Sequence, residues 1–186
     1  RVLFRSAYFN LSGEGDGCTI LDHELLLDAP YITPTDSELI PHGEFRAVKG
    51  TPFDFTAPKT VGKDDGARAT DTDMSYGGGY DHCFVFDKSR DKAEPYAVLY
   101  SAESGIEMKC YTDMPAVQFY AGNCLDQKGK NGHYYGRCGG LCLETQAIPN
   151  NVNVSKYAAY GSSIYDAGEV YRFTAKYAFG RSEERR

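Results

Sequence analysis

The sequence predicts an all-β fold, an antiparallel β-sandwich, on three observations. Short runs rich in Tyr, Phe, Val and Ile are separated by Gly, Pro, Asn and Asp, which is typical of strands joined by turns. No segment shows the sustained apolar repeat of a long helix. The segment 171–179 alternates an aromatic-rich set of side chains with a more polar set. With 186 residues, 41% of them hydrophobic, the chain is long enough for one domain with its own core.

Six segments carry this strand signal. In chain order they are 20–27, 82–86, 97–100, 106–111, 118–121 and 171–179. In the last segment the residues Tyr171, Phe173, Ala175, Tyr177 and Phe179 share one face, and we expect that face to pack on the core. The polar segments 64–79 and 126–140 are expected to be long loops, and such loops over a rigid sheet often carry binding residues.

Charge and cysteine content exclude several classes of protein. A formal net charge of -6 argues against nucleic acid and anionic membrane surfaces as partners. No apolar stretch is long enough to predict a transmembrane helix. The six cysteines have neither the paired spacing nor the histidine neighbours of a zinc site, so we expect reduced thiols and no metal site. Reduced thiols indicate a cytoplasmic protein.

One carboxylate stands out in the segment 141–149. Leu141 and Leu143 alternate with Cys142 and Glu144, which predicts a short strand on which Glu144 faces away from the leucines. A carboxylate partly withdrawn from water in a cleft can accept and return a proton near pH 7. A solvated or salt-bridged strand glutamate has the same local sequence, so both interpretations stay open at this point.

Five segments in a fixed order resemble the aldose 1-epimerase (galactose mutarotase) family. They are 8–13 (YFNLSG), 40–44 (IPHGE), 79–82 (GYDH), 117–123 (VQFYAGN) and 142–146 (CLETQ). The resemblance runs from Ala7 to about Phe179 and covers only the C-terminal half of the family's chain. It implies the large antiparallel sandwich of that family, the galactose mutarotase-like supersandwich, here in truncated form.

The resemblance also implies roles for individual residues. Glu144 would be the general base, and Asp81 and Gln118 would bind sugar hydroxyls, since a carboxylate accepts hydrogen bonds and an amide both donates and accepts. Tyr8 would line the substrate site or, as the alternative, be a core aromatic. The chemistry implied needs no cofactor and no metal.

Histidines need separate treatment, because the family's general acid is a histidine two residues before the Tyr-Phe-Asn-Leu run. Here that position is Ser6, whose hydroxyl has no useful acidity near neutral pH. His82 follows Asp81 directly, so a strand would turn it to the opposite face, and we expect it to be structural. His23, His42 and His133 are assigned no catalytic role.

The two ends of the chain are related at the nucleotide level. Residues 1–6 can be encoded by CGT GTG CTC TTC CGA TCT, and residues 181–186 by AGA TCG GAA GAG CGT CGT. The stretch CTC TTC CGA TCT is the reverse complement of AGA TCG GAA GAG, and it is a familiar sequencing-library adapter. We therefore expect 1–6 and 181–186 to be translated adapter, and 7–180 to be the C-terminal part of an aldose 1-epimerase domain. Unrelated codons in the source DNA would contradict this.

The function implied is interconversion of the α and β anomers of a neutral free hexose, galactose or glucose. As a separate polypeptide the chain is expected to be inactive, because it lacks the acid. Three alternatives stay open: a non-catalytic carbohydrate-binding module of the same fold, a hexose-6-phosphate epimerase, and a structural sandwich attached to a larger carbohydrate enzyme. A phosphorylated sugar would favour arginine clusters, which the acidic composition disfavours.

Overall fold

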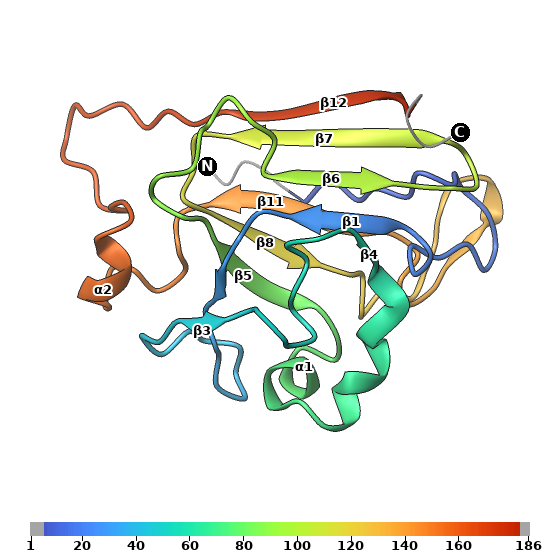
Figure 1. Cartoon of the computed structure of the whole chain (residues 1–186), viewed down its shortest axis with the longest axis horizontal. Coiled ribbons are helices and arrows are strands. Elements are labelled where there is room, and N and C mark those ends of the chain that lie inside the picture. The colour runs from blue at the N-terminus through green and yellow to red at the C-terminus, as the bar shows by residue number, and fades with distance from the viewer. Residues whose placement is uncertain (1–5, 183–186) are drawn as a thin grey trace.

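The structure, a computed structural model, describes residues 6–182, and two five-stranded antiparallel sheets pack face to face in it (Figure 1). Most of the two predicted adapter-derived ends, residues 1–5 and 183–186, lies outside the described residues. The first sheet has the order β12-β7-β6-β1-β4. Its strands are β1 (Glu24–Leu27), β4 (Lys59–Thr60), β6 (Ala97–Tyr100), β7 (Ile106–Thr112) and β12 (Ala175–Arg181).

The second sheet positions the candidate site, and its order is β11-β8-β5-β2-β3. Its strands are β2 (Tyr31–Ile32), β3 (Arg46–Ala47), β5 (Asp81–Val85), β8 (Ala116–Tyr120) and β11 (Cys142–Gln146). A separate hairpin pairs β9 (Gln127–Lys128) with β10 (Tyr134–Tyr135). The predicted antiparallel β-sandwich is therefore confirmed.

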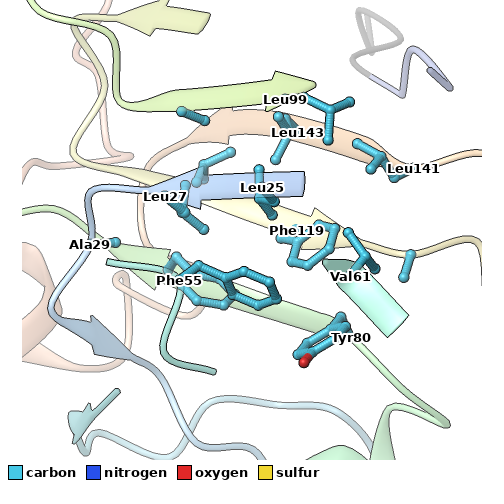
Figure 2. Close-up of a cluster of buried hydrophobic side chains, with 14 of the residues drawn as sticks. Leu25, Leu27, Ala29, Phe55, Val61, Tyr80, Leu99, Phe119, Leu141 and Leu143 are labelled. Carbon is cyan, nitrogen blue, oxygen red and sulfur yellow. The ribbon is translucent and has the colours of Figure 1, made fainter. Parts of the chain in front are cut away.

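The core lies between the two sheets (Figure 2). Leu25 and Leu99 from the first sheet meet Phe119 and Leu143 from the second, and all four are buried. Tyr80 stacks on Phe119 with 5.1 Å between ring centroids. Burial of apolar area at roughly 25 cal/mol per Å² is the main force that holds the two sheets together.

Helical turns replace the loop predicted for 64–79, and that prediction is wrong. The segment contains most of the 3-10 helix η1 (Val61–Ala69) and all of α1 (Thr72–Tyr76). Asp71 caps α1 by accepting a hydrogen bond from the Met74 backbone N–H at 3.2 Å. Met74 is the buried apolar residue of α1 that packs in the core. A single apolar residue gives no helical periodicity in the sequence.

The predicted loop 126–140 is also more ordered than expected, because it holds β9, β10 and the 3-10 helix η2 (Lys130–Gly132). The strand predicted for 20–27 is shorter and begins only at Glu24. Ile20 is buried, but in a turn, where its N–H donates to the Cys138 carbonyl at 2.8 Å.

The last strand differs from its prediction at both ends. β12 begins at Ala175 and lies at the edge of its sheet. Tyr177 packs against the core, whereas Phe179 is 58% exposed and Tyr171 is 40% exposed. The expected aromatic core face over 171–179 is therefore wrong except at Tyr177, because an edge strand has neighbours on one side only.

The short helix α2 (Ser155–Ala158) lies away from the sheets, at the left of Figure 1. Among the residues that the structure describes, no helix is both long and apolar enough to cross a membrane.

Candidate active site

One face of the second sheet gathers polar side chains from three neighbouring strands. Strand pairing places Glu144 of β11 opposite Gln118 of β8, and Gln118 opposite Cys83 of β5. One step along, Cys142 lies opposite Tyr120, and Tyr120 lies opposite Asp81. Because side chains alternate along a strand, these six residues share the face that points away from the core.

Glu144 faces away from Leu141 and Leu143, as the sequence predicted. Both leucines are buried in the core, while Glu144 lines a cavity on the other side of the sheet. Asp81 and Gln118 line the same cavity, whose volume is about 290 Å³. The structure therefore brings together three of the four residues singled out from the sequence.

Two amides connect the floor of this cavity. The Gln118 Nε2 donates to Asp81 Oδ1 at 2.8 Å, and the Gln146 Nε2 donates to Gln118 Oε1 at 3.4 Å. Burial raises the pKa of Asp81, the Gln118 hydrogen bond lowers it, and the negative charge of Glu144 adds a smaller rise. The two carboxylates therefore lie close enough to affect each other.

Tyr8, the fourth residue, is not among the residues that line this cavity. Its ring is 50% exposed and packs edge-on against Tyr120, with 6.2 Å between centroids. Burial, followed by the neighbouring Cys142, Tyr120 and Glu144, raises the pKa of Tyr8 to about 12. Tyr8 also lines a separate cavity together with Asn10 and Gly140.

Sequence reasoning missed Thr33, Cys83 and Gln146, all of which line the cavity. The backbone N–H of Thr33 donates to the Cys83 carbonyl at 3.0 Å, which extends the polar face beyond β5. Burial raises the pKa of Cys83 to about 12, so this thiol stays protonated at neutral pH. A signal for Gln146 existed, because it follows Glu144 by two residues and so shares its face.

Asp81 is held by a tight turn that precedes β5. The Asn123 Nδ2 donates to the carbonyls of Gly77 at 2.9 Å and Tyr80 at 3.0 Å. Gly79 has φ +137°, and a Cβ there would lie 2.5 Å from the Asn123 Oδ1. Only glycine fits between these groups, so the glycine run before Asp81 serves to bring Asn123 against the turn.

His82 lies on the core side, as expected from its place after Asp81. Its side chain is buried, and its Nε2 lies 3.1 Å from the Asp73 carbonyl. His23 is buried too, and its Nε2 accepts from the Leu11 N–H at 2.9 Å. Within residues 6–182 no histidine lines the Glu144 cavity, and no group of three or more His, Cys, Asp or Glu is arranged to hold a metal ion.

Two carboxylates and two amides on one face suit a ligand with several hydroxyl groups. Carboxylates accept hydrogen bonds from hydroxyls, and amides can both donate and accept. The fold and the site thus define a class of β-sandwich protein with a cavity suited to a polyhydroxylated ligand.

Comparison with known proteins agrees with this class. Residues 6–178 match the family model of the aldose 1-epimerases. The galactose mutarotase of Homo sapiens is 38% identical over 179 residues, which cover 95% of this chain and 49% of the relative. The aldose 1-epimerase of Escherichia coli is 33% identical over 173 residues, which cover 92% and 48%.

A solved structure agrees as well. The crystal structure of an aldose epimerase homologue from C. elegans superposes with a TM-score of 0.74 at 27% identity, over 88% of this chain and 47% of that one. The chain belongs to the aldose 1-epimerase family, and it spans about half the length of the relatives it matches.

Proposed function

We propose that the protein of which this chain is part is an aldose 1-epimerase that interconverts the α and β anomers of a neutral hexose, galactose or glucose. The observation that carries the proposal is the convergence of Glu144, Asp81 and Gln118 on one cavity in a member of this family. The proposed substrate is neutral, because the cavity lining contains two carboxylates and, among the described residues, no Lys or Arg.

Glu144 is proposed as the general base. It takes the proton from the C1 hydroxyl while the bond between C1 and the ring oxygen breaks and an acid protonates that oxygen. Rotation about the C1–C2 bond turns the other face of the carbonyl to the ring hydroxyl. Reclosure returns both protons and gives the other anomer, so the reaction consumes nothing.

Asp81 and Gln118 are proposed to hold the sugar. Each oxygen of an ionised Asp81 can accept from one of two neighbouring hydroxyls, and the hydrogen bond from Gln118 fixes the carboxylate in place. Tyr8 is proposed to border the bound ring on the side of Tyr120. We propose a cytosolic enzyme, as the expectation of reduced thiols from the cysteine spacing indicates.

The test measures the mutarotation of freshly dissolved α-D-galactose and α-D-glucose by polarimetry. The protein used is the complete protein encoded in the source gene. Glu144→Gln should lower kcat by about 10²- to 10⁴-fold, the usual contribution of a general base. The matched control is Glu107→Gln, which removes the same charge from a strand of the other sheet. Unchanged turnover in Glu144→Gln would contradict the proposed role.

A sugar-binding module without activity is the second candidate, and a residue other than histidine at position 6 of the intact gene would favour it, because the resemblance places the family's general acid there. A complete wild-type protein that binds galactose in calorimetry but does not speed mutarotation would support this candidate.

A further inference from the structure

Two hydroxyl groups in the lining of the Glu144 cavity lack a hydrogen-bond partner. The Oγ1 atoms of Thr33 and Thr35 are both withdrawn from solvent, and no nitrogen or oxygen within residues 6–182 bonds to either of them. Thr33 lies beside the Cys83 thiol, which is only a weak donor and acceptor. A buried hydroxyl without a partner lowers stability, so its presence calls for a physical reason. A ligand in the cavity that both threonines line would supply the missing partner.

Thr33 continues the row of cavity residues that begins at Glu144. Glu144 pairs with Gln118 and Gln118 pairs with Cys83, and the Thr33 N–H donates to the Cys83 carbonyl at 3.0 Å. Three strand spacings of about 4.8 Å put Thr33 about 14 Å from Glu144 along the sheet. A pyranose with a hydrogen bond at each end, together with the reach of the glutamate side chain, spans that distance. The threonines therefore lie at the end of the cavity away from the proposed reacting carbon.

An apolar wall closes the same end of the cavity. Leu39 and Pro41 line it, and Pro41 pairs with Thr35 in an isolated antiparallel bridge. Leu39 has φ +62°, a left-handed conformation that is costly for a bulky residue. The turn holds it there, because the Leu39 N–H donates to the Asp36 carbonyl at 3.0 Å. A hydrogen bond made beside such a wall is shielded from water and is stronger for that reason.

We propose that the hydroxyls of Thr33 and Thr35 bind the sugar hydroxyl on C4 or C6, at the end of the ring away from C1, when C1 lies at Glu144. A change of χ1 rotamer moves Oγ1 to the position of the Cγ2 methyl, so a hydroxyl that is covered in the free protein turns toward the ligand. Thr35 keeps 8% of its surface exposed although its Oγ1 is covered, so other atoms of this residue already reach the surface. This inference rests on the proposed function and deepens it, because two uncharged hydroxyls would select the far end of the sugar.

The test removes the hydroxyl from the protein and from the sugar in turn, with the complete enzyme. Polarimetry gives kcat/KM of wild type, Thr33→Val and Thr35→Val for galactose, 4-deoxygalactose and 6-deoxygalactose. Valine keeps the shape of threonine without the hydroxyl. At least one valine variant should lose about threefold to tenfold on galactose, the usual net contribution of a hydrogen bond. The same variant should lose nothing on the analogue that lacks the bound hydroxyl, and serine at that position should keep the activity on galactose.

The melting temperature separates this role from a structural one. Because the hydroxyls have no partner in the free protein, neither valine variant should melt at a lower temperature than wild type, while galactose should stabilise the variant less than it stabilises wild type. The matched control is Tyr96→Phe. The Tyr96 hydroxyl is also buried without a partner among the described residues, but it lies in the core between the sheets. Its removal should leave kcat/KM for all three sugars unchanged.

The outcomes distinguish failure of this inference from failure of the proposed function. If galactose reacts but neither valine variant changes kcat/KM, or if both deoxy analogues lose as much as galactose does, the inference is refuted and the proposed function stands. A lower melting temperature in both valine variants would show that the hydroxyls already have partners and would refute the inference as well. If the complete wild-type protein converts no hexose, the proposed function fails and this inference fails with it.

Discussion

His82 should make the fold sensitive to mild acid. Its Nδ1 accepts from the Asp81 backbone N–H at 3.1 Å, and its Nε2 lies 3.1 Å from the Asp73 carbonyl, which can only accept. The neutral ring with its hydrogen on Nε2 satisfies both partners. A second proton on Nδ1 would point at the Asp81 N–H, so the charged form fits poorly.

The size of the effect follows from the pKa of His82. Burial, the largest cause, lowers that pKa from 6.5 to about 4, against opposing effects of Asp73 and Asp71. Between these two values the unfolded chain binds a proton that the folded protein does not, so stability falls as pH falls. At 1.36 kcal/mol for each pKa unit, the full loss is about 3 kcal/mol, and about 2 kcal/mol is lost by pH 5.

The assay is urea unfolding at pH 8, 6, 5 and 4.5, with wild type and His82→Gln measured side by side. Glutamine keeps an N–H for the Asp73 carbonyl and does not titrate. The difference in unfolding free energy between the two proteins should therefore shrink by about 2 kcal/mol from pH 8 to pH 5. Phe84→Leu, two residues along β5, should lower stability by a similar amount at every pH. A difference between wild type and His82→Gln that does not change with pH would refute the reasoning.

Two further predictions concern stability. Arg46 bonds Asp71 at 2.5 Å and Asp73 at 2.6 Å, and Arg46→Met should cost about 3 kcal/mol in urea unfolding, because two largely buried carboxylates lose their partner. The exposed pair of Lys156 with Glu44 is the control, and Lys156→Met should cost less than about 1 kcal/mol. Gly122 has φ +69°, and a Cβ there would lie 2.3 Å from the Gly140 carbonyl oxygen, so Gly122→Ala should cost more than about 2 kcal/mol in thermal unfolding. Gly17→Ala, at φ +75° with open space around it, should cost only about 1 kcal/mol, and equal losses at both sites would contradict the contact argument.

The sheets were largely predictable from the sequence, because alternation and turn residues are local signals. The strand at 97–100 matches β6 at both ends, and the one at 82–86 matches β5 within one residue. The helical turns in 64–79 were not predictable, since Met74 alone anchors α1 and the surrounding residues are polar. Phe179 is exposed because β12 is an edge strand. The order of strands in a sheet cannot be predicted from a local sequence pattern.

The candidate site was predictable in part. Alternation alone placed Glu144 on the face opposite the leucines, and the resemblance supplied Asp81 and Gln118. The contribution of Thr33 and Cys83 to the site was not predicted, because strand pairing between segments far apart in sequence brings them there. Cys83 lies in the predicted strand 82–86, but the local sequence does not show which side of the sheet it faces.

The two faces of the second sheet tie the chemistry to the packing. On β11 and β8 the residues that line the cavity alternate with core residues, Glu144 with Leu143 and Gln118 with Phe119. A slip of one residue would put a leucine into the cavity and a carboxylate into the core, so the core contacts fix the positions of the polar groups. On β5 the core residue His82 also fixes the position of a cavity residue, because its neutral ring accepts a hydrogen bond from the backbone N–H of Asp81. Protonation of His82 should therefore loosen the Asp81 end of the cavity before the rest of the sandwich unfolds, and sugar affinity should fall at a higher pH than the loss of secondary structure.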